Sequence, residues 1–488
     1  MNIHLILQMA AEAMGERQAI TAGDQRLTYA DLAMAARRVA AKLKRGQRLA
    51  YLAENHPAMA AGIFGAALAG TSFVPISYRL AEEQIAFLMK RITPALLITE
   101  SEQQYPEMDR ISRTDAMSGD AMEGEAPDVD GAVAIELFTS GTTGEPKSAI
   151  LRHGNLMAYI LGSVEFMSAG EEEASLITVP PYHIAGISAV LSSTYAGRRM
   201  VQLPNFTPQG WIDLAQKESV THAFVVPTML QHIVEHVGRN GGTLELPKLR
   251  ALSYGGGKMP LPVIEKAMAL LPHVDFTNAY GLTETSSTIC LLGPEAHRDA
   301  IASDDPLVRR RLGSVGQALP TIELRIQTEE GTACKADQVG LVYVRGEQVS
   351  GEYEGAGSQL DDDGWFPTRD VGFVDGEGYL FLDGRADDVI VRGGENISPG
   401  EVEDVLRGHG SVKDVAVVAI PSEEWGEAVG AAIVCIGPAP DEDELCELVR
   451  GKLRSSRVPS RIIFIDALPY SETGKLLRRV VRDHLAQA

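Results

Sequence analysis

The stretch Thr139-Ser140-Gly141-Thr142-Thr143-Gly144-Glu145-Pro146-Lys147 gathers four hydroxyl side chains, two glycines and a lysine into nine residues. A largely apolar run, residues 132–138, leads directly into it and is typical of a buried strand. Glycines let a backbone approach a ligand closely. Backbone N–H groups and hydroxyls then surround phosphate oxygens, and a lysine adds a positive charge. The stretch therefore predicts a phosphate-binding loop that handles a nucleoside triphosphate.

This loop differs from the common P-loop, which ends in Gly-Lys-Ser/Thr. Pro146 precedes the lysine here, and Gly141 and Gly144 are three positions apart. A polar surface turn between strands is the simpler alternative, because Ser, Thr and Gly are frequent in turns. The motifs farther along the chain decide between the two.

The composition is that of a globular protein with more than one domain. The chain has 488 residues, of which 45% are hydrophobic and 23% charged. A formal net charge of −22 argues against general binding of nucleic acids. The four cysteines form no CxxC pair, which argues against a zinc site and a disulfide framework and fits a reducing cytoplasm. The N-terminus lacks a signal-peptide pattern, so we expect a cytoplasmic protein without integral membrane association.

Helical patterns and short β-branched runs alternate over most of the chain, which predicts an α/β fold. Thr28, with Asp31 three residues later, is a predicted helix N-cap. The apolar run 58–76 is rich in Ala and Gly, and we interpret it as a buried helix followed by a strand rather than a membrane span. Residues 101–130 are acidic and poorly patterned, and we interpret them as a mobile connection.

The last two-fifths of the chain change in character. Short strand patterns near 322–326, 341–344 and 379–382 predict a small β-rich subdomain. The final hundred residues predict a compact α+β module with helices at 399–407 and 441–453. Residues 450–483 carry nine basic and three acidic side chains, a local charge of about +6. They are either solvated helix faces or a surface that meets a phosphorylated ligand.

Three further motifs are weak when each is taken alone. Asn278–Thr285 follows a strand expected to end near Phe276 and places an aromatic ring, a hydroxyl and a carboxylate close together; a capped loop is the alternative. Asp370 lies just before a strand, where a carboxylate can accept both hydroxyls of a ribose, although turn-forming Asp residues are common. Residues 385–396 combine a charged corner with a double glycine, which suits either close backbone approach or a tight hairpin.

Two further patterns, one with a lysine and one with two histidines, carry little weight when each is taken alone. Lys475 follows a glycine in a loop before the last helix, a place where most lysines are surface charges. His232-Ile-Val-Glu-His236 matches an HxxEH zinc pattern, but no third ligand is suggested nearby and the segment is an ordinary amphipathic helix.

Taken together, these segments resemble the adenylate-forming (ANL) superfamily, in its branch of AMP-forming acyl-CoA synthetases. The resemblance covers the whole chain, with the motifs in the family's order, and Tyr182-His183 is similar to its substrate-gate motif. It implies a large N-terminal domain, 1–384, made of two α/β subdomains and the β-rich subdomain. It also implies a small mobile α+β C-terminal domain, 385–488, with a hinge near 385–388.

The resemblance also implies roles for individual residues. Lys475, Thr283, Glu284 and His183 are the implied catalytic residues, Glu284 also holds Mg²⁺, and Asp387 is the hinge residue. The residues implied to bind ATP and coenzyme A are Thr139, Ser140, Gly141, Thr142, Thr143, Gly144, Lys147, Gly255, Gly256, Asn278, Tyr280, Gly281, Asp370, Arg385, Gly393 and Gly394.

The implied reaction joins a carboxylic acid to CoA through an acyl-AMP, with ATP, Mg²⁺ and CoA as cofactor and co-substrates. The expected substrate is an apolar monocarboxylic acid, fatty or aromatic. Alternatives are a ligase that loads a carrier protein, a luciferase-like adenylating oxygenase and a nucleotide-binding protein without activity. The oligomeric state, with a homodimer as one option, is left open. Two positions depart from the family pattern: Arg369 stands where Gly is usual, and Ser77 where many relatives carry Asn.

Overall fold

The computed structural model describes residues 1–488 except 107, 130, 140–145, 471–475 and 488. The chain forms two compact units, Met1–Glu323 with Val344–Phe366, and Leu324–Tyr343 with Pro367–Ala488. Helices and strands alternate in both units, which confirms the predicted α/β class. The predicted boundary between residues 384 and 385 stays a prediction.

The first unit contains a nine-stranded sheet in which six neighbouring strands, from β13 to β1, run parallel. Because parallel strands run in the same direction, their carboxyl ends all lie at one edge of the sheet. In sheet order the strands are β15 (Gln317–Ala318), β14 (Ser287–Leu292), β13 (Asp275–Leu282), β12 (Ala251–Gly255), β11 (His222–Val225), β9 (Ala174–Ile177), β10 (Arg199–Gln202), β1 (Gln18–Ala22) and β2 (Gln25–Thr28).

An eight-stranded sheet completes the first unit. Its central strands from β7 to β6 are parallel, whereas β8 and the short strands beyond it are antiparallel. In sheet order they are β19 (Gly357–Ser358), β18 (Glu352–Tyr353), β8 (Lys147–Arg152), β7 (Val133–Thr139), β4 (Phe73–Pro75), β3 (Arg48–Leu52), β5 (Ala95–Thr99) and β6 (Met108–Ile111).

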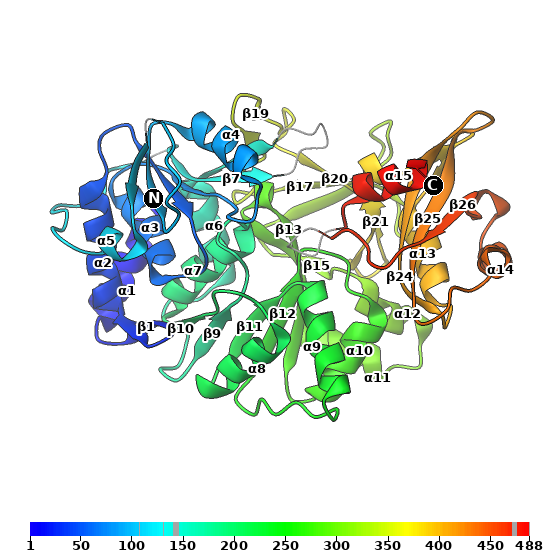
Figure 1. Cartoon of the computed structure of the whole chain (residues 1–488), viewed down its shortest axis with the longest axis horizontal. Coiled ribbons are helices and arrows are strands. Elements are labelled where there is room, and N and C mark those ends of the chain that lie inside the picture. Colours follow the sequence, from blue (N-terminus) through cyan, green and yellow to red (C-terminus); the bar gives the residue numbers. More distant parts are fainter. Residues whose placement is uncertain (107, 130, 140–145, 471–475, 488) are drawn as a thin grey trace. The chain divides into compact units, whose positions relative to one another are not determined.

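Helices pack on both sheets, and two local sequence predictions about them are confirmed. Thr28 caps the second helix in a full capping box with Asp31. Every residue of the third helix is buried, as expected for the apolar run before β4. Figure 1 shows the eighth, ninth and tenth helices side by side next to β11 and β12. The helices of this unit are α1 (His4–Met14), α2 (Tyr29–Lys42), α3 (Pro57–Leu68), α4 (Glu82–Ile92), α5 (Arg113–Ala116), α6 (His153–Ser163), α7 (Ile184–Ala196), α8 (Pro208–Lys217), α9 (Pro227–Arg239), α10 (Leu261–Leu270), α11 (Pro294–Ala302) and α12 (Pro306–Arg309).

The interpretation of residues 101–130 as a mobile connection was wrong for part of that segment. Met108–Ile111 forms β6, which pairs in parallel with β5, and Arg113–Ala116 forms α5 with Ser112 as its N-cap. The strand sequence Met-Asp-Arg-Ile has no strong β pattern of its own. Its pairing with a fully buried neighbour supplies the order that its residues do not.

The second unit has two smaller sheets. One has the order β16 (Glu323–Gln327), β17 (Gly340–Arg345), β20 (Phe366–Val374) and β21 (Leu380–Arg385). The other contains β23 (Glu395–Ile397), β22 (Ile390–Arg392), β25 (Gly426–Cys435), β24 (Val412–Ser422) and β26 (Arg461–Phe464). The helices are α13 (Pro399–Arg407), α14 (Glu442–Lys452) and α15 (Arg478–Gln487).

Side-chain alternation along β24 builds a core on each face of its sheet. Val415, Val417 and Ala419 belong to a cluster shared with residues of α13 and α14. The intervening residues of the strand belong to a second cluster shared with α15. Both faces are thus buried by helices, which explains why this strand is a nearly continuous apolar run.

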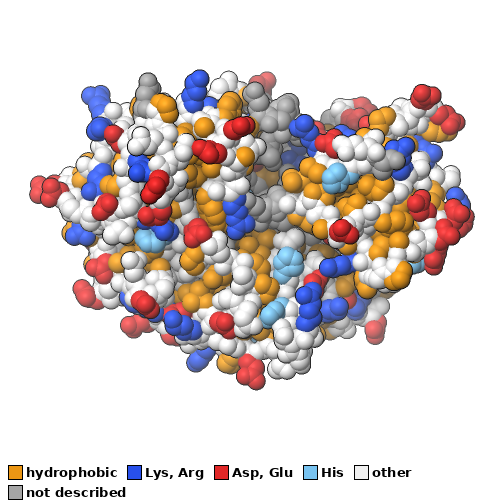
Figure 2. All heavy atoms as spheres, in the orientation of Figure 1, with side chains coloured by type: hydrophobic (Ala, Val, Ile, Leu, Met, Phe, Trp, Pro, Cys, Tyr) orange, Lys and Arg blue, Asp and Glu red, His pale blue; other side chains and the backbone are white. Residues whose placement is uncertain are grey.

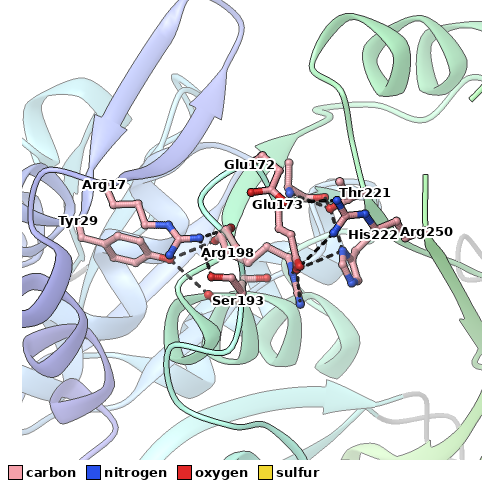
Figure 3. Close-up of polar contacts among 12 residues, drawn as sticks. Arg17, Tyr29, Glu172, Glu173, Ser193, Arg198, Thr221, His222 and Arg250 are labelled. Carbon is pink, nitrogen blue, oxygen red and sulfur yellow. Dashed lines mark hydrogen bonds and ion pairs between the residues drawn. The ribbon is translucent and has the colours of Figure 1, made fainter. Parts of the chain in front are cut away.

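A polar network lies at the amino-terminal edge of the nine-stranded sheet (Figure 3). Glu173, just before β9, accepts from Arg198 at 3.0 Å and from Arg250, just before β12, at 3.4 Å. His222 lies 3.8 Å from the same carboxylate, but burial lowers the pKa of His222 to about 4, so it is neutral at pH 7. The Tyr29 hydroxyl donates to the Arg198 carbonyl at 3.1 Å. The network ties helix α2 and several strands together at the edge opposite their carboxyl ends.

The surface mixes both signs of charge on the face that Figure 2 shows. Among the described residues of the basic segment 450–483, four arginines form ion pairs with acidic side chains: Arg450, Arg454, Arg457 and Arg478. No helix in the described part of the chain is long and apolar enough to cross a membrane.

Candidate active site

The carboxyl edge of the nine-stranded sheet collects many of the predicted site residues. His183 is the N-cap residue of helix α7, which follows β9; Gly255 ends β12, and the segment 278–282 ends β13. β9, β11, β12 and β13 are parallel, so these three places lie at the same edge. Ligands of open α/β sheets bind at this edge. Sequence motifs separated by up to a hundred residues are therefore brought together by the topology.

His183 is a neutral, largely enclosed imidazole. Its ring lies 4.5 Å from that of Tyr182, which contacts Tyr78 edge-on at 5.7 Å. Burial, with a smaller contribution from the charge of Arg79, lowers the pKa of His183 to about 3. Its Nε2 atom is buried and has no hydrogen-bond partner among the described residues. The ring can therefore exchange a hydrogen bond with a ligand without adding a charge at neutral pH.

Two glycines on this edge allow strands to approach closely. A Cβ atom on Gly255 would lie 2.1 Å from the Ala279 carbonyl oxygen, and one on Gly281 would lie 1.8 Å from that of Ser287. Gly256 has a φ of +86°. These positions require glycine for the backbone itself, and they fix the path that leads into residues 283–285.

The segment Asn278–Thr285 is more regular than expected. β13 continues to Leu282 because it pairs with the antiparallel β14, and a 3-10 turn, η1 (Thr283–Thr285), follows. The Asn278 side chain donates to the Ser314 carbonyl at 3.0 Å and is buried, so it supports the structure locally. Tyr280 is half-buried on the strand.

The residues that follow Glu284 have strained backbones. Ser286 and Ser287 have φ angles of +56° and +118°, which side-chain-bearing residues rarely adopt. The Gln348 side chain donates to the Thr285 carbonyl at 3.1 Å and to the Thr288 carbonyl at 2.8 Å, across this turn. Strain held in place by surrounding contacts is typical of functional sites.

Glu284 is held by a segment 66 to 69 residues away in sequence. The N–H groups of Ser350 and Gly351 donate to its backbone carbonyl at 2.8 and 3.0 Å. The Tyr353 hydroxyl donates to its carboxylate. Sequence reasoning missed Tyr353, because no local pattern marks a residue whose role comes from the pairing of β18 with β8.

The predicted phosphate loop connects β7 to β8. Its two ends are described: Thr139 pairs with Lys147, and the Thr139 hydroxyl donates to the Lys147 carbonyl at 3.4 Å. The Lys147 ammonium lies 5.6 Å from the centre of the Tyr353 ring. Arg91, also missed by sequence reasoning, donates to the Pro146 carbonyl at 2.6 Å. Ser140, Gly141, Thr142, Thr143 and Gly144 lie outside the described residues.

The second unit contains the predicted ribose and hinge residues. Asp370 and Arg385 are partners in the pairing of β20 with β21, and the guanidinium donates to the carboxylate at 2.9 Å. Asp370 is buried and Arg385 half-buried. Asp387 lies in a short 3-10 turn, η3 (Ala386–Asp388), directly after β21.

Arg369, which stands where the family usually has Gly, has a backbone conformation that favours glycine. Its φ is +62°, a conformation that costs an ordinary residue about 1 kcal/mol or more and costs glycine nothing. Its guanidinium lies 3.7 Å from the Asp387 carboxylate, and both of these side chains are exposed. Arg369 therefore lacks the backbone freedom of a glycine, but it makes a contact with Asp387, the predicted hinge residue, that a glycine could not make.

Gly393 and Gly394 form a tight hairpin between β22 and β23. Both have positive φ angles, +58° and +83°, as a two-residue turn of this kind requires. The N–H of Gly393 donates to the Trp425 carbonyl at 2.9 Å, and a Cβ there would lie 2.7 Å from the Trp425 ring. The structure thus confirms the tight hairpin, which was the alternative interpretation of the double glycine. Lys475 lies outside the described residues.

The donor set around Glu284 fits magnesium. No group of three or more His, Cys, Asp or Glu side chains suited to a metal occurs in the described ranges, which include the HxxEH segment on α9. Mg²⁺ commonly keeps several waters and binds through one or two carboxylates plus substrate phosphates. A single fixed carboxylate beside the ends of a phosphate loop meets that need.

A cavity of about 640 Å³ lies elsewhere in the first unit. It is lined by residues after β3 and β5 and by the beginnings of α4 and α5, including Glu54, Glu100 and Arg113. Tyr78 lines it and also contacts Tyr182. Its lining includes none of residues 183–190, 226–231, 253–257 and 285–288, where the resemblance to the family implies that the acid binds.

Comparison with known proteins identifies the family. Residues 7–354 match the model of the AMP-binding enzyme family, and residues 401–475 match that of the AMP-binding enzyme C-terminal domain. The chain is 31% identical to 2-succinylbenzoate–CoA ligase of Bacillus licheniformis, over 97% of this chain and 98% of that one. It is 33% identical to feruloyl-CoA synthase of an Amycolatopsis species, over 95% of each.

Solved structures agree with these matches. The o-succinylbenzoate CoA synthetase of Bacillus subtilis, in complex with its acyl-adenylate intermediate, has a TM-score of 0.85 at 29% identity over 98% of both chains. The same synthetase with ATP and magnesium has a TM-score of 0.84 at 28% identity over 99% of both chains. The predicted superfamily and fold class are confirmed, and the chain belongs to the AMP-binding enzyme family.

Proposed function

We propose that this protein is an ATP-dependent acid:CoA ligase that forms an acyl-AMP and then an acyl-CoA, releasing pyrophosphate and AMP. The observation that carries the proposal is the arrangement at Glu284. Its carboxylate is fixed by Tyr353, whose ring lies beside Lys147 at the end of the phosphate loop. A fixed carboxylate and a loop end with a cation are the parts needed to hold a metal-bound triphosphate.

In the first half-reaction, the carboxylate of the acid attacks the α-phosphorus of ATP and pyrophosphate leaves. Both reactants are anions, so positive charge must offset their repulsion. We assign that role to Lys475, with Lys147 and the hydroxyls of the phosphate loop on the departing pyrophosphate and Thr283 on the α-phosphate. Magnesium, when bound at Glu284, neutralises phosphate oxygens. Neutral His183 is suited to orient the acid by a hydrogen bond.

In the second half-reaction, the thiol of CoA attacks the acyl carbonyl and AMP leaves. We assign Asp370 and Arg385 to the ribose and Tyr280 to the adenine. Rotation near Asp387 would withdraw Lys475 and present the hairpin of Gly393 and Gly394 to the pantetheine arm. A hinge of this kind needs only a few residues that change φ and ψ.

The substrate we propose is an aromatic monocarboxylic acid. The names of two similar proteins, 2-succinylbenzoate–CoA ligase and feruloyl-CoA synthase, specify aromatic acids for those proteins. The Tyr182 ring lies beside His183 in this chain and contacts the Tyr78 ring edge-on, and aromatic faces and edges attract one another. A fatty acid is the alternative, and mass detection of acyl-CoA over a panel of both classes decides between them.

Separate assays of the two half-reactions test the mechanism. Lys475→Ala is expected to abolish adenylate formation, measured by pyrophosphate exchange, and still convert preformed acyl-AMP to thioester. Asp387→Pro is expected to do the reverse, because proline fixes φ. Loss of both half-reactions in either variant would refute the assignment. Free CoA tested against a carrier protein identifies the acceptor.

We propose a cytoplasmic location, which is supported by four cysteines without disulfide bonds. A homodimer is the oligomeric state we propose to test, by sedimentation of the full-length protein.

A further inference from the structure

One short segment, residues 350–354, holds both the backbone carbonyl and the side-chain carboxylate of Glu284. Two consecutive N–H groups, of Ser350 and Gly351, donate to its backbone carbonyl. The Tyr353 hydroxyl donates to Oε1 of its carboxylate. The other carboxylate oxygen accepts no hydrogen bond from the described residues. The side chain is thus held by one oxygen, with the second oxygen left for a ligand.

Tyr353 is itself firmly placed. It pairs with Ala149 across the antiparallel contact of β18 with β8, the strand that begins at Lys147. The next residue, Glu354, donates its N–H to the Ser148 carbonyl at 2.9 Å, and its carboxylate pairs with Arg91 at 3.1 Å. Arg91 also donates to the Pro146 carbonyl. The segment that holds Glu284 therefore also holds the trailing end of the phosphate loop.

We propose that Tyr353 is a positioning residue whose hydroxyl aims the Glu284 carboxylate and so sets the affinity of the site for its divalent metal. The inference rests on the proposed function, in which Glu284 holds the metal. A hydroxyl donor restricts rotation of a carboxylate while leaving its charge in place. Hydrogen bonds of this kind to metal ligands commonly change metal affinity or activity by about 10- to 100-fold.

The hydrogen bond to Glu284 can be removed by a substitution that keeps the aromatic ring of Tyr353. Tyr353→Phe deletes the hydroxyl and keeps the ring, so the contact of the ring with the Lys147 ammonium remains. Tyr159→Phe is a matched control, because Tyr159 is a half-buried tyrosine on helix α6 that packs against the core of the first unit.

The test measures metal binding without turnover. Mn²⁺ is titrated into the full-length protein with a non-hydrolysable α,β-methylene analogue of ATP, and bound Mn²⁺ is followed by electron paramagnetic resonance. We expect Tyr353→Phe to weaken Mn²⁺ binding about tenfold. We expect no change in analogue binding in the presence of EDTA, and none in either measurement for Tyr159→Phe.

Three outcomes overturn the inference or its basis. Unchanged Mn²⁺ binding in Tyr353→Phe, with Glu284→Gln still weakening it, refutes the positioning role and leaves the proposed function intact. Unchanged binding in Glu284→Gln refutes Glu284 as the metal ligand. Equal weakening of the analogue in EDTA shows that Tyr353 contacts the nucleotide instead, which also overturns the positioning role.

Discussion

Replacing Gly281 by alanine would place a methyl group inside the hydrogen-bonded contact between β13 and β14. The new Cβ would lie 1.8 Å from the Ser287 carbonyl oxygen and 2.9 Å from the Thr288 Cα atom. Real Cβ atoms essentially never come closer than 3.0 Å, so the strands must separate by about 1.2 Å. Both obstacles are backbone atoms, which cannot move aside by changing rotamer.

The separation affects both stability and catalysis. Forced expansion of a packed contact costs about 3 kcal/mol at the upper end of the usual range. Glu284 follows Gly281 by three residues, so its carboxylate moves with the strand. A displacement of about 1 Å at a catalytic group lowers the rate by about 100-fold. We therefore expect Gly281→Ala to lose about 3 kcal/mol of unfolding free energy and about 100-fold in adenylation.

Urea unfolding and pyrophosphate exchange measure the two effects. Gly154→Ala is the matched control: the same substitution meets no atom within 4 Å on helix α6, and we expect it to be neutral or stabilising by up to about 1 kcal/mol. If Gly281→Ala retained wild-type stability and exchange, the close approach of the two strands would be refuted as the reason for glycine at this position.

Three further outcomes are expected. Arg369→Gly should be more stable than Arg369→Ala by about 1 kcal/mol in urea unfolding, because both lose the contact with Asp387 and only glycine relieves the positive φ; equal stabilities would contradict this. Glu173→Gln should lower the unfolding free energy by about 2 kcal/mol and leave kcat/KM within about twofold, since it lies at the opposite sheet edge from the site; a large loss of activity without loss of stability would refute it. The free energy of unfolding should fall as the pH is lowered from about 6.5 toward 4. In the folded chain, burial lowers the pKa of four histidines to about 3 or 4, so in this pH range they take up protons only when the chain is unfolded. A urea-unfolding free energy that does not change with pH would contradict this. These histidines are His56, His153, His183 and His222.

Features specified by neighbouring residues could be predicted from the sequence. The capping box of Thr28 with Asp31 needs only a short-range pattern, and so does the buried helix before β4. The motif around Asn278 was found because its aromatic, hydroxyl and acidic residues, Tyr280, Thr283 and Glu284, lie within five positions of one another. The fold class follows from the alternation of elements, which is also a local property.

Features that depend on strand pairing could not be predicted. Strand β6 has little β propensity, and its order comes from β5. The Tyr353–Glu284 hydrogen bond joins residues 69 positions apart, through a pairing that no pattern near either residue indicates. The unusual residue Arg369 was noticed in the sequence, but the positive φ that accounts for it is a property of the folded backbone.

The network of Glu173, Arg198 and Arg250 has a consequence for how the enzyme can change. It stabilises the parallel strands from the edge opposite the site, where no substrate needs to be recognised. Residues at the carboxyl edge therefore need to contribute less to the alignment of the strands. Libraries that vary the acid pocket should tolerate many substitutions while this network is intact and few once Glu173 is replaced. For redirecting the enzyme toward new acids, the amino edge is the part to leave unchanged.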